Sequence, residues 1–331
     1  MREVAGGLVP VDSVEIQVVV DNVTDSLSSI LRGVTNENEV LRRHGMKTMS
    51  GAAKCCAHHG LALAVTARTG GDARTLLFDA GPEAYTFQRN AARLGVAFAD
   101  VDAVVLSHGH WDHGGGLLEA VRLVHAARAG RPFECHVNAG MFAPRANSYG
   151  DGSVVPYEEL PDVDALAAAG ATVVCAPEAR LVGGGAYYLS GEIPRVTAYE
   201  RGLPGHVRRS ADGAGWEPDP WLLDERYVAL HVRGKGVVVL TACSHAGVVN
   251  VLTDARSVFG DLPLHAVMGG LHLSGGQIEP IIPDTVRDLA GFGLAKIVPA
   301  HCTGWRAVHA LVQRFGEAVV MPAAVGRLFA F

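Results

Sequence analysis

The sequence lacks the features of membrane, exported and disulfide-rich proteins. No apolar run reaches the roughly 18 uninterrupted residues of a membrane helix, because charged residues, Gly or Pro interrupt each run. The N-terminal segment has no basic start followed by an apolar run and a small-residue cleavage site, so we expect no signal peptide. The six cysteines include no C-x-x-C pair and do not resemble a disulfide framework in a chain of this length. These absences predict a cytoplasmic protein that does not bind membranes.

Signatures of nucleic-acid binding and of nucleotide hydrolysis are also missing. The formal charge is −6 and no basic block occurs, which argues against a phosphate-backbone partner. No G-x-x-x-x-G-K-[ST] segment is present, so a P-loop is excluded. The run C-S-H-A-G at 243–247 lacks the full set of glycines of a G-x-S-x-G nucleophile elbow. A small-molecule substrate is therefore expected, and the sequence gives no indication of the oligomeric state.

What is present is a globular α/β pattern. Hydrophobic residues make up 49% of the 331 residues and charged residues 19%, enough apolar surface for a sizeable core. Short β-rich runs alternate with helical patterns, which predicts an α/β or αββα arrangement. The expected strands are 14–20, 61–67, 74–79, 102–107, 133–137, 171–175, 227–232 and 236–241, and the expected helices are 82–95, 116–128 and 304–316.

The organisation along the chain favours one domain. Strand and helix content is similar on either side of about residue 175, and no internal repeat occurs. We expect a single domain over 1–331 made of two structural halves, about 1–175 and 176–331. Residues 201–226 are rich in Gly, Pro, Asp and Arg without any period, which predicts a long loop.

The segment DAVVLSHGHWDHGGG carries the strongest chemical signal. It places His108, His110, Asp112 and His113 directly after a buried-strand pattern and before a glycine-rich helix start. A lone histidine in a loop is usually solvated or packed, but three histidines and an aspartate within six positions at a strand end predict a metal site. Imidazole and carboxylate suit zinc, with iron or manganese as alternatives. The three glycines are expected to let the backbone turn tightly beside the metal.

Further ligands are expected at later strand ends. His245 follows the β-type run 236–241 and His301 follows AKIVPA, so both are predicted metal ligands. His272, next to Gly269 and Gly270, is a candidate ligand, proton donor or substrate contact. Six further histidines without such context are expected to be structural or surface residues: His44, His125, His206, His231, His265 and His309.

Three other residues are weaker candidates. Asp79 lies where a strand ends at a Gly turn and either forms an ordinary turn or orients a metal-binding histidine. Arg145 and Arg195 are candidates for a bidentate clamp on an anionic substrate group, although a solvated surface charge is the simpler interpretation of each.

Taken in order, these motifs resemble the metallo-β-lactamase superfamily. FDAG and SHGHWDHGGG are similar to its first motif and its H-x-H-x-D-H metal motif. More narrowly, VDN, HHGLAL, LFDAG, LSHGHWDHGGGL, GEIPR, LTACSHAGVVN, GGLHL, PAHCTG and a closing VG resemble the subfamily of 7,8-dihydropterin-6-methyl-4-(β-D-ribofuranosyl)aminobenzene-5′-phosphate synthases. The resemblance covers nearly the whole chain.

The resemblance implies an αββα four-layer sandwich, two mixed sheets flanked by helices, with metal at one edge. It implies that His108 and His110 bind a first metal, that Asp112 and His113 bind a second, and that His301 is the last histidine ligand. One departure concerns the aspartate that bridges the two metals in many members. Here the corresponding strand ends in T-A-C-S-H, which leaves Cys243 or His245 as its replacement and leaves open whether one or two ions bind. Glu192 is expected near the position of the usual middle histidine.

The lead functional hypothesis is a metal-dependent hydrolase in which activated water attacks a small molecule, phosphorylated or not. Asp112 and His272 are its candidate catalytic residues. Three alternatives remain open: the C–N bond-forming synthase of the resembled subfamily, an iron-dependent redox or sensing protein, and a binding module without activity.

Overall fold

The structure of the chain, a computed structural model, describes residues 7–331 and contains two large sheets within that range. The first sheet has eight strands, in spatial order β2 (Val34–Thr35), β18 (Leu328–Ala330), β1 (Ser13–Val20), β3 (Ala62–Thr69), β4 (Asp72–Phe78), β5 (Val101–Val105), β6 (Glu134–Val137) and β9 (Thr172–Cys175). The second has six, in the order β10 (Arg180–Val182), β11 (Tyr187–Leu189), β14 (Tyr227–Val232), β15 (Gly236–Thr241), β16 (Leu264–Gly270) and β17 (Lys296–Ala300).

Strand alternation explains why the two sheets face each other. Leu76 and Phe78 of β4 belong to one hydrophobic cluster, whereas Leu77 between them belongs to another. In β15, Val238 and Leu240 join the same shared cluster as Leu76 and Phe78. Because successive side chains of a strand point to opposite faces, each sheet contributes one face to a common central core and keeps a second apolar face for its helices.

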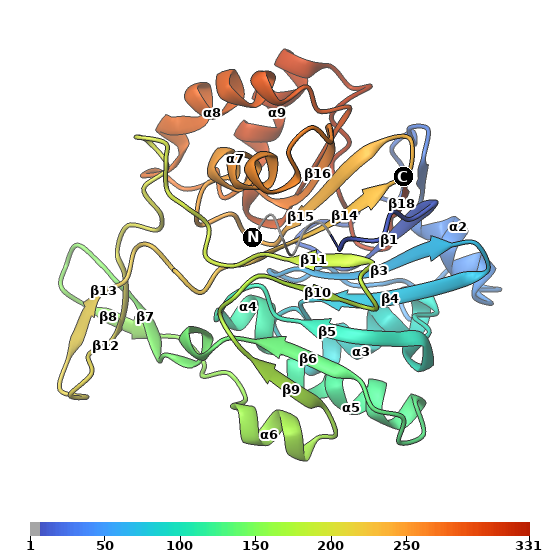
Figure 1. Ribbon diagram of the computed structural model, residues 1–331, viewed down its shortest axis with the longest axis horizontal. Coiled ribbons are helices and arrows are strands. Elements are labelled where there is room, and N and C mark those ends of the chain that lie inside the picture. Colours follow the sequence, from blue (N-terminus) through green and yellow to red (C-terminus); the bar gives the residue numbers. More distant parts are fainter. Residues whose placement is uncertain (1–6) are drawn as a thin grey trace.

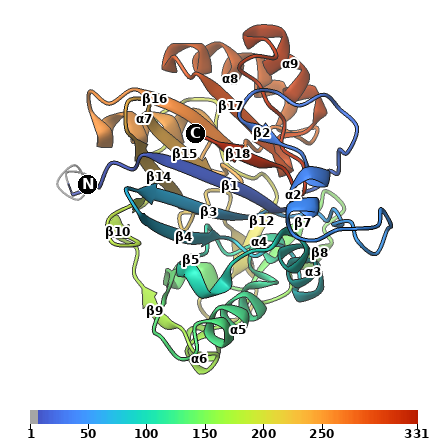
Figure 2. The same ribbon diagram turned by 90° about the vertical axis from the view of Figure 1, so that its right-hand side faces the viewer.

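Helices cover the outer face of each sheet, as Figures 1 and 2 show. The eight-stranded sheet is covered by α3 (Ala84–Leu94), α5 (Leu117–Ala127) and α6 (Val163–Ala168). The six-stranded sheet is covered by α7 (Val248–Phe259), α8 (Ile282–Leu289) and α9 (Trp305–Phe315). Two further helices are α2 (Glu37–Arg43) and α4 (Trp111–Gly114). The order of layers confirms the predicted αββα sandwich, and strands and helices occur where the periodicity predicted them.

A third, four-stranded sheet was not predicted. Its strands, in order, are β13 (Trp216–Pro218), β12 (His206–Arg209), β7 (Arg145–Ser148) and β8 (Val154–Pro156), and it projects to one side of the sandwich (Figure 1). The prediction of a loop over 201–226 is therefore wrong in part, because β12 and β13 pair there as a hairpin. These strands have three or four residues, too few to show a period in a segment rich in turn-forming residues.

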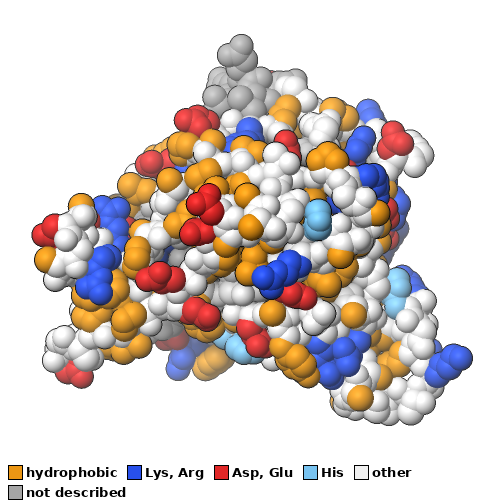
Figure 3. Space-filling view, turned by 90° about the horizontal axis from the view of Figure 1, so that it is seen from below, with side chains coloured by type: hydrophobic (Ala, Val, Ile, Leu, Met, Phe, Trp, Pro, Cys, Tyr) orange, Lys and Arg blue, Asp and Glu red, His pale blue; other side chains and the backbone are white. Residues whose placement is uncertain are grey.

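The surface seen from below the sandwich carries both signs of charge. Lysine and arginine side chains are interspersed with aspartate and glutamate over this face (Figure 3). None of the helices formed by residues 7–331 has the length and hydropathy needed to cross a lipid bilayer.

Parallel pairing brings several strand ends to one edge. Strands β4, β5, β6 and β9 pair in parallel in the first sheet, and β15, β16 and β17 pair in parallel in the second. The carboxyl ends of parallel strands lie at the same edge of a sheet, where ligands of α/β proteins commonly bind. The loops after β4, β5, β15, β16 and β17 carry Asp79 and the predicted metal ligands together with His272.

Candidate metal centre

The loop after β5 presents the H-x-H-x-D-H residues as a buried group. His108, His110, Asp112 and His113 are each at most 7% exposed. The ring centroid of His108 lies 4.5 Å from that of His110 and 4.4 Å from that of His113. Asp112 and His113 lie in the single-turn helix α4, which turns both side chains toward the same edge.

The three histidines predicted at later strand ends come from the opposite sheet and meet this group. The Nε2 atom of His245 lies 3.2 Å from Nε2 of His108. The ring of His301 lies 4.9 Å from that of His113, centroid to centroid. The ring centroid of His272 lies 4.3 Å from that of His245, with the two ring planes tilted by 56°. The structure therefore brings together histidines that are far apart in the sequence and that follow strands of two different sheets.

Left-handed backbone is concentrated in these loops. Six non-glycine residues within 7–331 have positive φ, and four of them lie at the strand ends: Asp79 (62°), Ser244 (58°), His272 (45°) and His301 (47°). Such conformations cost on the order of 1–3 kcal/mol each and persist where the surroundings hold them, often at functional sites.

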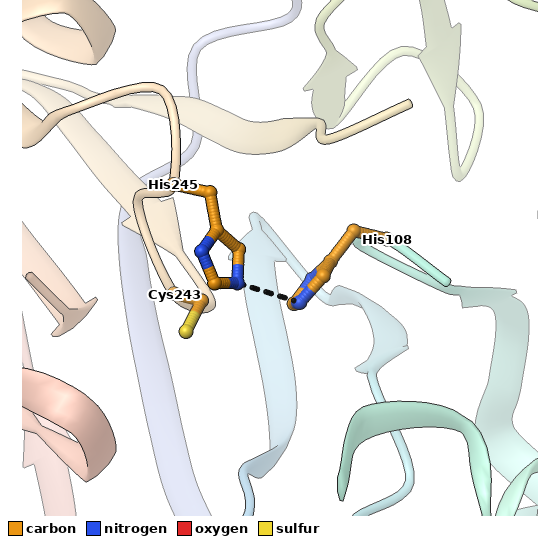
Figure 4. Close-up of side chains that lie close together, drawn as sticks. All are labelled: His108, Cys243 and His245. Carbon is orange, nitrogen blue, oxygen red and sulfur yellow. Dashed lines mark hydrogen bonds between the residues drawn. The ribbon is translucent and has the colours of Figure 1, made fainter. Parts of the chain in front are cut away.

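Cys243 is the donor that both halves of the site share. Its Sγ forms one group of potential ligands with His108 and His245 and another with His113 and His301, and within each group the donor atoms lie within 4.8 Å of one another. Cys243 and His245 come from one loop while His108 faces them from the other side (Figure 4). Of the two candidate replacements for the bridging aspartate, only Cys243 reaches both groups.

The residues present fit a divalent transition metal. The Nε2 atoms of His113 and His301 are buried and have no hydrogen-bond partner among the described residues. Nε2 of His108 and Nε2 of His245 face each other at 3.2 Å, so two imidazole edges are turned toward one point. Imidazole, thiolate and carboxylate are the ligand types that zinc prefers. A third donor group, formed by His59, Asp112 and His301, adjoins the same site.

Burial and neighbouring charges set the ionisation of these groups. Burial, reinforced by the neighbouring histidines, lowers the pKa of His108, His110 and His245 well below the usual value, so their lone pairs are free for a metal. Burial also acts on His113, but the carboxylates of Asp112 and Asp79 outweigh it and raise its pKa to about 9. Burial opposes the ionisation of Asp112, yet His113 and His301 hold its pKa well below the usual value.

Asp79 contacts a site histidine directly. Its Oδ2 lies 2.8 Å from Nδ1 of His113, and it accepts hydrogen bonds at 2.7 Å from both the backbone N–H and the hydroxyl of Ser107. Because the carboxylate is an acceptor, Nδ1 of His113 is the donor and Nε2 is left facing the site. This contact has the geometry of the orienting role considered for Asp79.

The glycines after the motif serve a different purpose from the expected tight turn. Gly114, Gly115 and Gly116 are absent from the residues with positive φ. A Cβ at Gly115 would lie 1.9 Å from the carbonyl oxygen of Pro82, and one at Gly116 would lie 2.3 Å from that of Ala80. Glycine is required because the loop after β4 approaches this backbone closely.

His206 was expected to be structural or superficial, but it lies against the site. It is 1% exposed, and its Nε2 lies 3.0 Å from Nε2 of His110. Its Nδ1 donates to the carbonyl oxygen of Asp219 at 2.7 Å, which leaves an Nε2 lone pair directed at His110. Sequence reasoning missed His206 because β12 was not recognised as a strand.

His59 and Cys302 were also missed. Nε2 of His59 lies 3.3 Å from Oδ2 of Asp112. Its position just before β3 was the available signal. Because β3 pairs antiparallel with β4, the start of β3 lies beside the end of β4, at the sheet edge that carries the site. Cys302 follows His301 directly, and its Sγ lies 3.0 Å from Sγ of Cys243. Burial opposes its ionisation, but the hydrogen bond from Cys243 and the charge of His301 hold its pKa well below the usual value.

The two arginines and Glu192 are not placed as expected. Arg145 is not free to clamp an anion, because its buried guanidinium pairs with Asp224 and Asp219. Arg195 donates to the carbonyl oxygens of Ile193 and Trp221 and does not line the cavities that include His245, His272 or His301. Glu192 is exposed and belongs to none of the donor groups found within 7–331. Pattern alone could not show that these side chains find partners elsewhere.

Two cavities border both His245 and His272. One, of about 260 Å³, is bordered by His59, His110, Asp112, His245, His272 and His301 together with Cys243 and Cys302. The other, of about 500 Å³, shares His245 and His272 and extends over Tyr199, Leu271, Ile278 and Arg201. A third, of about 490 Å³, borders His301, so histidines of the site line more than one hollow.

Comparisons with known proteins agree with this geometry. Residues 61–157 match the family described as the metallo-beta-lactamase superfamily. The chain is 26% identical over 272 residues, 78% of its length and 85% of the relative's, to a 7,8-dihydropterin-6-methyl-4-(beta-D-ribofuranosyl)-aminobenzene-5'-phosphate synthase of Methanocaldococcus jannaschii.

Solved structures resemble nearly the whole fold. Tm1679, described as a metal-dependent hydrolase of the beta-lactamase superfamily, superposes with a TM-score of 0.67 at 22% identity over 96% of this chain and 98% of that one. The metallo-beta-lactamase fold protein YhfI of Bacillus subtilis superposes with a TM-score of 0.53 at 11% identity over 97% and 100%. The chain therefore has the metallo-β-lactamase fold, and its residues 61–157 are similar to that superfamily.

Proposed function

We propose that the chain is a metal-dependent hydrolase of a small molecule, with two zinc ions as its resident metals. The observation that carries this proposal is the thiol of Cys243, which belongs to both the His108–His245 group and the His113–His301 group. Both groups border or adjoin a cavity open to a small molecule.

The two metal positions would take different ligands. His108, His110 and His245 would hold the first metal, with His206 as a fourth imidazole whose tautomer is fixed by the Asp219 carbonyl. Asp112, His113 and His301 would hold the second. Cys243 would bridge the two positions in place of the superfamily's usual aspartate.

When bound, divalent metals supply Lewis acidity and lower the pKa of water toward neutrality. The chain's own residues would carry out the proton transfers. Asp112, ionised at neutral pH and bordering the smaller cavity, would accept a proton from the attacking water. His272, which borders both cavities and has a buried Nε2 without a partner among residues 7–331, would donate a proton to the leaving group.

The larger cavity would receive the body of the substrate. Its volume of about 500 Å³ and its lining of apolar side chains beside Tyr199 suit a drug-sized organic molecule. Arg201 lies at this cavity, where its Nε donates a hydrogen bond to the carbonyl oxygen of Ala198. Its charge favours a substrate with an anionic group.

The test combines metal content with activity. Wild type and a His108→Ala/His110→Ala variant are purified without added metal, and metals are measured by plasma mass spectrometry. Hydrolysis is assayed with bis(p-nitrophenyl) phosphate and simple lactones. We expect two equivalents of zinc and turnover in wild type, with loss of both in the variant, while His309→Ala on the exposed side of α9 behaves as wild type. No metal in reconstituted wild type would overturn the proposal.

A synthase is the second candidate function, favoured by the relative from Methanocaldococcus jannaschii. Condensation of a dihydropterin diphosphate with a ribofuranosylaminobenzene phosphate releases diphosphate, whereas hydrolysis does not require the second substrate. Diphosphate formed only when both substrates are present would replace the hydrolase proposal. A visible absorption band in the purified protein would instead indicate iron at the same ligands.

A further inference from the structure

Cys302 is a buried thiol at the metal centre that the proposed function does not use. Its Sγ lies 3.0 Å from Sγ of Cys243 and 3.4 Å from the carbonyl oxygen of Cys243. Both cysteines are reduced, and they are only 8% and 4% exposed. Both border the cavity of about 260 Å³, so a small oxidant that enters the site reaches both sulfur atoms.

The pair has two chemical uses: with His272 it forms a further group of potential metal ligands, and its two sulfur atoms also lie close enough to be joined. Two thiolates on one tetrahedral zinc, with Zn–S bonds of about 2.3 Å, are held about 3.8 Å apart. The observed 3.0 Å is shorter and lies between that separation and the roughly 2.05 Å of a disulfide bond.

Gly270 permits this approach. A Cβ at position 270 would lie 2.7 Å from Sγ of Cys302 and 3.2 Å from Cα of Cys243. The end of β16 thus leaves room for the two thiols to meet, and a larger residue there would separate them.

We propose that Cys243 and Cys302 are a modification site: a hydroperoxide converts them to a reversible disulfide, which withdraws Cys243 from the metals. One thiolate attacks the peroxide O–O bond and gives a sulfenic acid and, with hydrogen peroxide as oxidant, one water molecule. The second thiol attacks that sulfur, forms the S–S bond and releases another water. Two thiols lose two protons and two electrons in total, and one peroxide is reduced to two waters.

The disulfide does not depend on the hydrolase proposal, whereas metal release rests on Cys243 being a ligand. Zinc-loaded protein is titrated with hydrogen peroxide, free thiols are trapped with N-ethylmaleimide, and non-reduced peptides are mapped by mass spectrometry. We expect one cross-linked pair joining Cys243 to Cys302, lighter by two hydrogens and restored by dithiothreitol. Zinc released during the titration is followed with a chromogenic chelator.

Two variants make the result specific. In Cys302→Ser the cross-link is absent, and zinc release slows by at least about tenfold because Cys243 has no resolving thiol beside it. Cys175→Ser removes an exposed cysteine on β9 and should leave both readouts unchanged. Sulfinic acids without a 243–302 cross-link in wild type would overturn the disulfide. Equal zinc release from wild type and Cys302→Ser would overturn its link to the metals. Neither readout involves turnover, so inactivity toward phosphodiesters would refute the hydrolase proposal alone.

Discussion

At the scale of single residues, Asp79 shows how one carboxylate organises the site. It sits at the end of β4 with φ of 62° and is fully buried. Its two carboxylate oxygens accept hydrogen bonds from the backbone N–H and the hydroxyl of Ser107 and from Nδ1 of His113. Partners of this kind fix the tautomer and ring orientation of a metal-binding histidine.

Replacing Asp79 by Asn should therefore weaken metal binding without unfolding the protein. Asn also tolerates positive φ, but its amide is a poorer acceptor for His113. We expect zinc affinity to fall by about 10–100-fold, the usual cost of losing such a partner. Competitive titration against a chelator of known affinity measures it. Asp72→Asn, at the exposed far end of the same strand, is the control, and equal affinities for both variants would contradict the orienting role.

The sequence predicted those residues whose signal is local. His108, His110, Asp112 and His113 lie within one short motif after a strand, so their meeting needs only one loop. His206 could not be predicted, because its contact with His110 depends on a hairpin built from a segment with turn-like composition. Arg145 failed as an anion clamp for a related reason, since its partner Asp224 lies 79 residues away.

At the scale of elements, the Arg145–Asp224 pair connects β7 to the loop after β5, which carries His108 and His110. Arg145 Nη1 donates to Asp224 Oδ2 at 3.0 Å, and the same oxygen accepts the backbone N–H of Gly109 at 2.9 Å. Both charged residues are at most 5% exposed. Their pairing connects the third sheet to the loop between His108 and His110.

Arg145→Met should be strongly destabilising, because it leaves the carboxylate of Asp224 buried without its cation. We expect the free energy of unfolding to fall by about 3–5 kcal/mol, as for other broken buried ion pairs, measured by urea denaturation. Arg208→Met on the adjacent β12 breaks an exposed pair with Glu217 and should cost less than about 1 kcal/mol. Similar losses in the two variants would show that burial of the first pair is unimportant.

Glu200 links another loop to the start of α7 and gives the fold a pH dependence. It accepts the N–H groups of Val249 and Asn250 at 2.9 Å each. Burial raises its pKa from 4.5 to about 7, against the lowering effect of those hydrogen bonds. The folded state holds the proton of Glu200 more tightly than the unfolded state does. The stability that protonated Glu200 contributes is therefore present at pH 4.5 and is lost as pH rises through about 7.

Glu200→Gln, which cannot titrate, isolates this effect. As pH rises from 4.5 to 7, the free energy of unfolding of wild type should fall relative to that of the variant, by up to about 3 kcal/mol. Chemical denaturation at several pH values measures it. A difference that stays constant over this range would show that the carboxyl is ionised throughout.

At the scale of the whole molecule, the candidate ligands come from both sheets of the sandwich. The loop after β5 belongs to the eight-stranded sheet, whereas Cys243, His245 and His301 follow strands of the six-stranded sheet. Short β-rich apolar runs predicted strands before these loops, and the family resemblance implied the layers. The sequence pattern could not predict which sheet edges meet, because strand register and the packing of one sheet on the other are decided by the core between the sheets.

Metals at this edge should therefore stabilise the closed sandwich as a unit. Ligands from two sheets converge only in the folded chain, so binding favours that state by mass action, by about 2.7 kcal/mol per site at a free metal concentration 100 times the dissociation constant. We expect the melting temperature of chelator-treated protein to rise steadily with buffered free zinc. The apolar core between the sheets does not depend on metal, so the metal-free protein should still unfold cooperatively.

A His108→Ala/His110→Ala variant should show a smaller rise, and His309→Ala on the exposed side of α9 should match wild type. A melting temperature independent of zinc in wild type would mean either that no metal binds or that the ligands also bind it when unfolded. Plasma mass spectrometry on the same samples separates these outcomes, because only the second leaves zinc on the protein. Either result would remove the metal as the link that holds the two sheets together at this edge.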